Sequence, residues 1–180
     1  MQGKTVIAHT LNALLSFPKI AGVVIPASST WQTALQQACG PVMMNYADKE
    51  VRWITGGRTR RESVYLGIQA LPETANIVLV HDAARPHVTH GLIERVLQPL
   101  LTQQAIAAIP GLPSTDTLKQ VVQQPNGSFV VSCTVDREAL WRVQTPQAFF
   151  REPLEQAHRL VEQSISITDD AQLLELSGLG

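Results

Sequence analysis

Short runs of β-branched and other apolar residues alternate along the chain with longer segments whose apolar residues recur at helical spacing. The clearest run is 77–80, and the segment after it places Leu92, Val96 and Leu100 on one helical face. Repeated strand-helix winding of this kind favours an α/β fold with a doubly wound, mostly parallel sheet. The predicted strands are 22–25, 51–54, 77–80 and 105–109, and the predicted helices are 7–15, 30–38, 64–71, 92–100, 152–163 and 168–178.

The pattern changes between residues 117 and 135, where two extended runs flank the sequence Pro125-Asn126-Gly127. Asn-Gly between two extended runs is a strong hairpin signal, so 118–122 and 129–133 are predicted to pair in antiparallel fashion. We therefore expect a protruding β-hairpin arm at 117–135. A hairpin with few neighbouring strands is marginally stable in water, so the arm is expected to pack on another surface, with a second subunit as one candidate.

Composition and charge exclude several classes of protein. With 180 residues, of which 44% are apolar, the chain is long enough for one well-filled core, and no linker divides it. The net charge is −1 and charged residues make up 16% of the chain, so nothing indicates binding to nucleic acid. No apolar run reaches the roughly 20 residues that span a bilayer. Since the N-terminal residues also lack the features of a signal peptide, we expect a cytoplasmic protein without a membrane segment.

Neither the cysteines nor the common phosphate-binding motifs indicate chemistry. Cys39 and Cys133 are too few for a disulfide scaffold or a zinc site, and each is predicted to be a buried thiol. The glycines form neither G-x-G-x-x-G nor G-x-x-x-x-G-K-S/T. A doubly wound domain usually opens with a strand whose following loop holds the phosphates of the ligand, whereas this chain opens with a predicted helix. The sequence thus predicts that this first strand is missing.

The segment directly after the 77–80 strand carries the strongest candidate chemistry. Ligands of doubly wound sheets bind at the carboxyl ends of the strands, and the sequence His-Asp-Ala-Ala-Arg-Pro at 81–86 lies at such an end. The carboxylate of Asp82 suits Mg²⁺, and the guanidinium of Arg85 suits a phosphate. An Asp–Arg pair that only fixes a turn explains the same residues equally well.

Other polar segments also have a structural alternative. The Gly-Gly turn at 56–57 precedes three arginines at a helix start, where backbone N–H groups favour anions, although a solvated basic turn explains them almost as well. The loop 113–119 supplies hydroxyls, a carboxylate and an ammonium, but local turn chemistry is the better explanation. Thr168, Asp169 and Asp170 are interpreted as an N-cap with acidic residues in the first helical turn.

Taken in order, five segments resemble the 2-C-methyl-D-erythritol 4-phosphate cytidylyltransferase family. The most specific is His-Asp-Ala-Ala-Arg-Pro at 81–86. The others are Gly56-Gly57 with Arg60 and Ser63, Asp116-Thr117 with Lys119, Thr134-Val135-Asp136-Arg137, and Thr145-Pro146-Gln147. The resemblance runs from Gly3 to the end of the chain. It implies a Rossmann-like nucleotidyltransferase of isoprenoid biosynthesis that joins cytidine triphosphate (CTP) to methylerythritol phosphate and releases pyrophosphate.

The resemblance also implies which residues contact the nucleotide and a metal ion. Asp82 is expected near the reacting phosphates and Mg²⁺, or another divalent cation, and is the one expected metal ligand. Gly57 and Ser63 are expected to contact the cytosine and its neighbourhood, and Ala83 is a further expected substrate contact.

For the second substrate, the resemblance implies a cradle around the phosphate of methylerythritol phosphate. Its expected members are Arg85, Thr117, Arg137 and Thr145, and the expected catalytic residues are Asp82, Arg85 and Arg137. The family's hairpin arm exchanges between two subunits. The resemblance therefore implies a homodimer formed through 117–135, in which Arg137 completes the active site of the partner.

Residues 1–180 are interpreted as a single nucleotidyltransferase domain that lacks both ends of the family pattern. The family's initial strand, its Gly-rich loop with Arg and a following Lys are not found, nor are its closing strand, second metal-binding Asp and final Lys. As a whole protein, these residues are expected to fold poorly and catalyse weakly; as part of a longer chain, they are expected to keep the family function. Two alternatives stay open: a ribitol-phosphate cytidylyltransferase, disfavoured by Ala83-Ala84, and a non-catalytic nucleotide-binding or dimerisation module.

Overall fold

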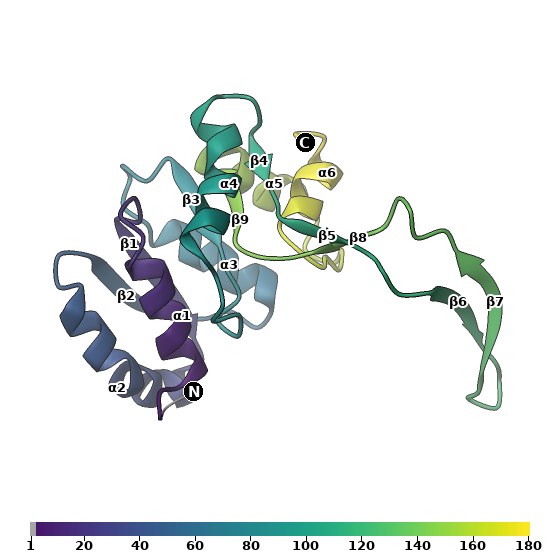
Figure 1. Ribbon diagram of the computed structural model, residues 1–180, viewed down its shortest axis with the longest axis horizontal. Helices are drawn as coiled ribbons and strands as arrows, with labels where there is room; N and C mark the ends of the chain where they lie inside the picture. Colours follow the sequence, from purple (N-terminus) through teal and green to yellow (C-terminus); the bar gives the residue numbers. More distant parts are fainter. Residues whose placement is uncertain (1–2) are drawn as a thin grey trace. The chain divides into compact units, whose positions relative to one another are not determined.

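The computed structural model describes residues 3–180, so the part of the signal-peptide expectation that concerns Met1 and Gln2 lies outside the described residues. In chain order the elements are α1 (Val6–Leu15), β1 (Gly22–Ala27), α2 (Ser29–Asn45), β2 (Glu50–Thr55), α3 (Arg60–Gln69), β3 (Ile77–Val80), α4 (His90–Leu101), β4 (Ala107–Ala108), β5 (Gly111–Pro113), β6 (Leu118–Gln123), β7 (Phe129–Val135), β8 (Trp141–Val143), β9 (Gln147–Phe150), α5 (Arg151–Leu160) and α6 (Ala171–Ser177) (Figure 1). They form two compact units: residues up to Ile109 together with Thr145–Gly180, and Pro110–Gln144. Within residues 3–180, no helix has the length and apolar character needed to cross a bilayer.

In the first unit, β1 and β2 pair in parallel over their whole length, and α2 is the crossover that parallel neighbours require. Leu15 of α1 is buried in one cluster with Cys39 and Val42 of α2, so the prediction of a buried Cys39 is confirmed. Helix α2 continues through Gly40 and Pro41, although the sequence predicted its end near Gly40. Burial of the apolar side chains on both sides of the proline stabilises the helix beyond that point.

The second sheet of this unit has the order β3-β9-β4, and β9 is antiparallel to both neighbours. Side chains of β3 alternate between its two faces: Ile77 and Leu79 pack in a cluster with α4, whereas Val78 and Val80 pack in a cluster with α5 and α6. Helices therefore cover both faces of this sheet, which confirms the doubly wound α/β fold.

Two details of this sheet differ from the prediction. Strand β4 contains two residues instead of the expected five, and β9 was not predicted at all. Gln147, Ala148 and Phe149 of β9 are all buried, so the strand shows no alternation that would separate it from the start of a helix. Because β9 is antiparallel, the parallel pairing among the described residues is confined to β1 and β2.

The second unit contains the predicted hairpin, since β6 and β7 pair in antiparallel fashion around the turn at Asn126 and Gly127. Gly127 has a φ of +82°, and the Asn126 side chain accepts the backbone N–H of Ser128 over 3.0 Å. Strands β5 and β8 form a second antiparallel pair. Every residue of β6 is exposed and Cys133 of β7 is exposed too, so the prediction of a buried Cys133 is wrong. The prediction assumed that a cysteine in an apolar strand is buried. It failed because, among the described residues, no other element of the second unit covers the strand that carries Cys133.

Candidate active site

The loop 81–86 follows the carboxyl end of β3 and brings Asp82 and Arg85 into contact. Nε of Arg85 donates to Oδ2 of Asp82 over 2.9 Å, and the backbone N–H of Arg85 donates to the Asp82 carbonyl over 3.0 Å. The pair thus fixes a turn, as the structural alternative supposed. The side chains are still 37% (Asp82) and 43% (Arg85) exposed, so both remain accessible to a ligand.

His81 and Thr145 hold the backbone of this loop in place. Nε2 of His81 lies 3.0 Å from the carbonyl of Arg85, which can only accept, so Nε2 carries the proton. Burial lowers the pKa of His81, and the neutral ring therefore accepts the Thr145 hydroxyl at Nδ1, 2.8 Å away. The same Thr145 oxygen accepts the backbone N–H of Asp82 over 3.2 Å. One buried threonine thus connects the segment before β9 to the position of Asp82.

Helix α1 also holds this loop. The hydroxyl of Thr10, a buried residue of α1, donates to the carbonyl of Ala83 over 2.7 Å. Ala83 itself is exposed. The loop therefore has its backbone tied to the core while its surface stays open, which is the arrangement a ligand site requires.

Gly57 and Ser63, the two residues expected near the cytosine, contact each other directly. The backbone N–H of Gly57 donates to Oγ of Ser63 over 3.0 Å, and Oγ donates to the carbonyl of Thr59 over 2.9 Å. Thr59 caps α3 by accepting the N–H of Glu62. A Cβ at Gly57 would lie 2.3 Å from Cγ of Glu62, so a larger residue there forces the Glu62 side chain to move. The turn before α3 is therefore closely packed and glycine-dependent.

The three arginines at the start of α3 have different surroundings. Arg58 is 94% exposed and pairs with Glu62, as expected of a solvated basic turn. Arg61 is buried and donates to backbone carbonyls near the end of α5, including Glu162 at 2.9 Å, which is a structural role. Arg60 alone faces the candidate site, where its Nε lies 3.9 Å from Oδ1 of Asp82.

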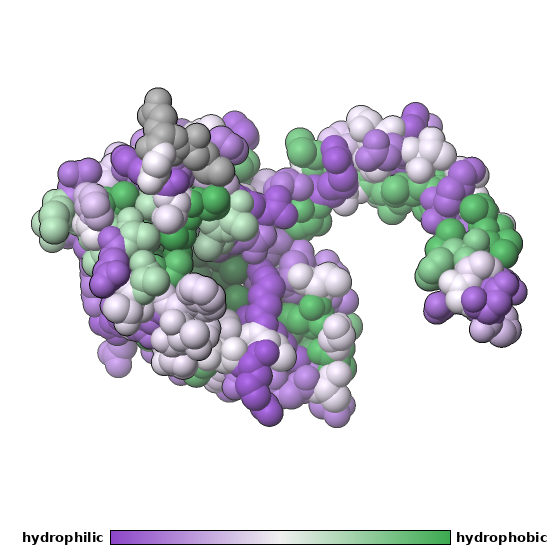
Figure 2. Space-filling view, turned by 90° about the horizontal axis from the view of Figure 1, so that it is seen from below, coloured by the Kyte–Doolittle hydropathy of each residue, from purple (hydrophilic) through white to green (hydrophobic). Residues whose placement is uncertain are grey.

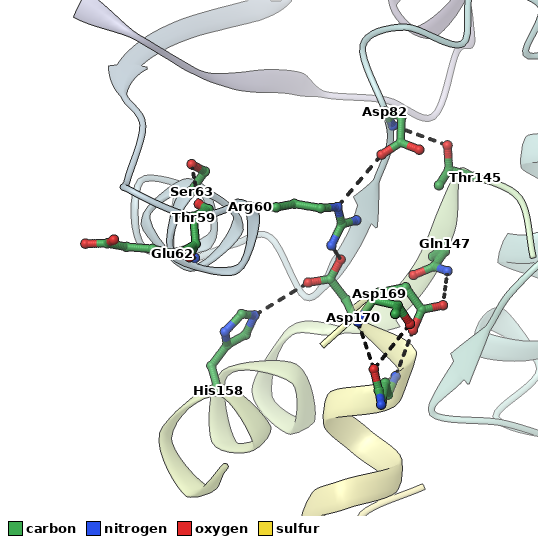
Figure 3. Close-up of polar contacts among 12 residues, drawn as sticks. Thr59, Arg60, Glu62, Ser63, Asp82, Thr145, Gln147, His158, Asp169 and Asp170 are labelled. Carbon is green, nitrogen blue, oxygen red and sulfur yellow. Dashed lines mark hydrogen bonds and ion pairs between the residues drawn. The ribbon is translucent and has the colours of Figure 1, made fainter. Parts of the chain in front are cut away.

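The loop 168–170 provides the second partner of Arg60. Oδ2 of Asp170 lies 2.8 Å from Nη1 of Arg60, and Asp170 is completely buried. Figure 3 shows Arg60 extending from α3 between Asp82 and Asp170. Neighbouring Asp169 accepts the backbone N–H of Gln172 over 3.0 Å and the side-chain N–H of Gln147 over 2.9 Å. The predicted helix-capping role therefore belongs to Asp169, while Asp170 points into the protein towards the arginine.

Burial perturbs the ionisable groups beside Asp170. Burial raises the pKa of Asp170, and the charge of Arg60 opposes that shift. Burial, followed by the charges of Arg61 and Arg60, lowers the pKa of His158 to about 4, so this imidazole is neutral at physiological pH. His158 lies 3.8 Å from Oδ1 of Asp170. The electrostatic partner of Asp170 at neutral pH is therefore Arg60, not His158.

The charged groups suit a metal ion that arrives with a nucleotide. Within the part of the chain that the structure describes, no three His, Cys, Asp or Glu side chains gather closely enough to hold a metal by themselves. Mg²⁺ bound with a nucleotide needs only one or two carboxylates, because phosphates and water provide its other oxygen ligands. Asp82, with its partly exposed carboxylate, fits that kind of site.

The remaining predicted site residues belong to the second unit. Nη1 of Arg137 donates to the carbonyl of Thr115 over 2.6 Å, and both Arg137 and Thr117 are exposed. The first unit thus brings together Gly57 with Ser63 and joins Asp82, Arg85 and Thr145. The roles of Thr117 and Arg137 in binding methylerythritol phosphate stay predictions.

Sequence reasoning missed Asp170 as part of this site and left Arg60 without a role. The two residues are 110 positions apart, and their contact depends on how α3 packs beside the loop before α6. The adjacent aspartates at 169 and 170 contain one signal of this role. A helix needs only one aspartate as its cap, so the second is available for another contact.

Comparisons with known proteins place the chain in a family. The family profile of 2-C-methyl-D-erythritol 4-phosphate cytidylyltransferase matches residues 1–180. The chain is 36% identical to the enzyme of that name from Prochlorococcus marinus, over 99% of this chain and 75% of the relative, and 38% identical to that of Shewanella amazonensis, over 98% and 70%. The crystal structure of the Thermus thermophilus enzyme superposes with a TM-score of 0.71 at 33% identity, covering 98% of this chain and 76% of the other.

Proposed function

Since the chain belongs to the 2-C-methyl-D-erythritol 4-phosphate cytidylyltransferase family, we propose that it transfers a cytidylyl group from CTP to methylerythritol phosphate, with Asp82, Arg85 and Arg137 as the catalytic residues. The reaction releases pyrophosphate and provides a precursor for isoprenoids. The observation that carries this assignment is the Asp82 carboxylate, held beside Arg85 in a loop whose backbone is fixed by Thr145 and Thr10.

The chemistry requires little more than positioning and charge neutralisation. A phosphate oxygen of methylerythritol phosphate attacks the α-phosphorus of CTP, and the bond from that phosphorus to the bridging oxygen of pyrophosphate breaks. Both substrates are anions, so cationic side chains must bring them together and stabilise the charge of the transition state. Arg85 is the proposed clamp for the attacking phosphate, since its guanidinium is partly exposed beside Asp82.

Asp82 is the proposed ligand of a divalent cation, with Mg²⁺ as the expected ion. Such an ion, when bound, neutralises phosphate charge and favours departure of pyrophosphate. The chain contributes a carboxylate whose direction is set by the turn 82–85 and by the hydrogen bond from its own backbone N–H to Thr145. Gly57, Ser63 and Ala83 are the proposed contacts to the nucleotide.

We further propose that residues 1–180 form one nucleotidyltransferase domain whose arm, 117–135, joins two subunits into a homodimer. The arm carries exposed apolar side chains, which include Val121, Val122, Phe129, Val130 and Val131. Figure 2 shows green, apolar patches on the arm. A second copy of the arm would cover such a surface. Arg137 and Thr117, at the base of the hairpin, would then complete the phosphate cradle of the partner. Because both proposed substrates are charged and do not cross membranes unaided, the proposed location is the cytoplasm.

Substrate competition tests this function. The full-length protein is supplied with CTP, Mg²⁺ and an equimolar mixture of methylerythritol phosphate and ribitol phosphate, and the cytidine-diphosphate products are separated by chromatography. We expect the methylerythritol product to predominate. A predominant ribitol product assigns the chain to the sister activity, and CTP binding with no product assigns it to a non-catalytic nucleotide-binding module.

A further inference from the structure

Arg60 lies between two carboxylates at unequal distances. Its Nη1 is 2.8 Å from Oδ2 of Asp170, whereas its Nε is 3.9 Å from Oδ1 of Asp82, beyond hydrogen-bond distance. Asp82 is partly exposed and Asp170 is completely buried. A guanidinium is attracted more strongly to a buried carboxylate than to one in contact with water. The dielectric constant is lower around the buried group, so the attraction between the two charges is screened less. The position of Arg60 is therefore determined by Asp170.

Asp170 occupies a fixed position because the residues before it are hydrogen-bonded on two sides. Asp169 accepts from Gln172 of α6 and from Gln147 of β9, and the backbone N–H of Thr168 donates to Oε1 of Gln172 over 2.8 Å. Gln147 lies two residues after Thr145, which accepts the backbone N–H of Asp82. Asp82 is thus held through its backbone by the segment directly before β9, and Arg60 is held through Asp170 by a loop that is hydrogen-bonded to β9 (Figure 3).

The separation of Arg60 from Asp82 matters because a metal ion and a guanidinium compete for the same carboxylate. Arg85 already donates to Oδ2 of Asp82. A second arginine at hydrogen-bond distance from Oδ1 would neutralise the carboxylate further and occupy the oxygen that a cation needs.

On the basis of the proposed role of Asp82, we propose that Asp170 is a positioning residue: it keeps Arg60 beyond hydrogen-bond distance from Asp82 and so leaves that carboxylate available to a divalent cation. Asp170 acts only through Arg60 and is assigned no contact with substrate or metal. Without its charge, the guanidinium moves onto Asp82 and weakens cation binding. A purely structural role, in which the ion pair ties α3 to the loop before α6, leaves cation binding unaffected.

Two variants separate these roles, and both are expected to fold. Asp170→Asn removes the buried charge, and the Arg60 side chain, 40% exposed, keeps its contact with water. The double variant Arg60→Met with Asp170→Asn removes both partners, so no buried charge is left unpaired. Glu155→Gln is the matched control, because it breaks the 2.7 Å ion pair between Glu155 and Arg151. The backbone N–H of Arg151 donates to the carbonyl of Asn76, which precedes β3, whereas Asp82 follows β3, so this pair lies at the other end of the strand.

The affinity for Mn²⁺ is measured in the full-length protein by electron paramagnetic resonance in the presence of CTP. We expect Asp170→Asn to weaken Mn²⁺ binding by about fivefold, the upper range for a partly exposed ion pair. The double variant is expected to regain wild-type affinity, because the competing guanidinium is gone, and Glu155→Gln is expected to bind as the wild type does. The inference is overturned if Asp170→Asn binds Mn²⁺ normally, if the double variant binds as weakly as the single one, or if the wild type binds none.

Pyrophosphate release, measured on the same samples, separates this inference from the proposed function. Wild-type protein that shows the expected Mn²⁺ pattern without turnover contradicts the function and supports the role of Asp170. Normal turnover with unchanged Mn²⁺ affinity in Asp170→Asn supports the function and contradicts the role of Asp170.

Discussion

The hydroxyl of Thr145 lies 2.8 Å from Nδ1 of His81 and so connects the segment before β9 to the residue that follows β3. The same oxygen accepts the backbone N–H of Asp82. A carboxylate in an exposed loop is thereby given a fixed direction by a side chain that is itself 9% exposed. Positioning of this kind is what phosphoryl-transfer chemistry requires of a protein.

Replacing Thr145 tests this connection. Thr145→Val keeps the shape but removes the hydrogen-bond partner of the His81 ring nitrogen Nδ1, which is partly buried, and of the Asp82 backbone N–H, which is expected to cost about 1–3 kcal/mol in the free energy of unfolding. Turnover is expected to fall as well, because the Asp82 loop loosens. Urea denaturation and steady-state kinetics measure the two effects. Thr145→Ser restores the hydroxyl and should recover both quantities; a valine variant with wild-type kinetics would show that this bond does not position Asp82.

Arg137 provides a test of the proposed phosphate cradle. Arg137→Ala is expected to lower turnover by about a hundredfold or more, since it removes a cation from the attacking phosphate, while the unfolding midpoint stays unchanged because the side chain is exposed. Arg142→Ala, at another exposed arginine of the same unit, is the matched control and should retain activity. Near-normal turnover in Arg137→Ala contradicts the assigned role.

The low pKa of His158 predicts a loss of stability in acid. The imidazole has a pKa of about 4 in the folded protein and about 6.5 when unfolded, so the unfolded chain binds a proton first as the pH falls. The free energy of unfolding should therefore decrease between pH 6.5 and pH 4, by about 3 kcal/mol from this residue, with no further loss below pH 4. Urea titrations across this range measure the slope.

His158→Leu isolates that contribution, because leucine fills a similar volume and does not titrate. The difference between wild type and variant should grow in the variant's favour as the pH falls from 6.5 to 4. His87→Gln, at an exposed histidine, is the control and should leave the slope as it is. Parallel curves for wild type and His158→Leu would show that His158 is not buried in its neutral form.

The hairpin arm predicts a self-association that charge can disrupt. Val122 and Val130 are opposite each other on the hairpin and each is 52% exposed. Val130→Lys is expected to weaken the homodimer at least tenfold, because the dimer would have to bury a lysine without a partner. Sedimentation velocity across a concentration series measures this, with Gln124→Lys in the turn as the control. A wild-type protein that stays monomeric at high concentration excludes the proposed homodimer.

The sequence predicted the features of the fold that depend on local patterns. Residues 77–80 form β3 as predicted, because four consecutive apolar residues followed by polar ones mark a buried strand end. The hairpin was predicted from Asn126-Gly127, whose preference for a positive φ at the second residue is a property of the two residues themselves. Strand β9 was missed because its burial on both faces comes entirely from tertiary packing.

The same distinction applies to the site. Asp82 and Arg85 were identified because strand ends in this kind of sheet carry ligands, and the structure shows them in contact. The contacts of Thr145 with His81 and of Arg60 with Asp170 join residues 64 and 110 positions apart, and no local pattern contains them. Adjacent aspartates at 169 and 170 divide into a helix cap and a buried ion-pair partner only when the surrounding helices are in place.

The proposed function places Asp82 at the centre of a cytidylyl transfer. Its decisive test is pyrophosphate release by the full-length protein with CTP, methylerythritol phosphate and Mg²⁺ present together. We predict release that requires all three, and a loss of about a hundredfold or more in Asp82→Asn with an unchanged unfolding midpoint. Asp82→Asn that releases pyrophosphate at the wild-type rate, or wild-type protein that binds CTP and releases none, would contradict the claim.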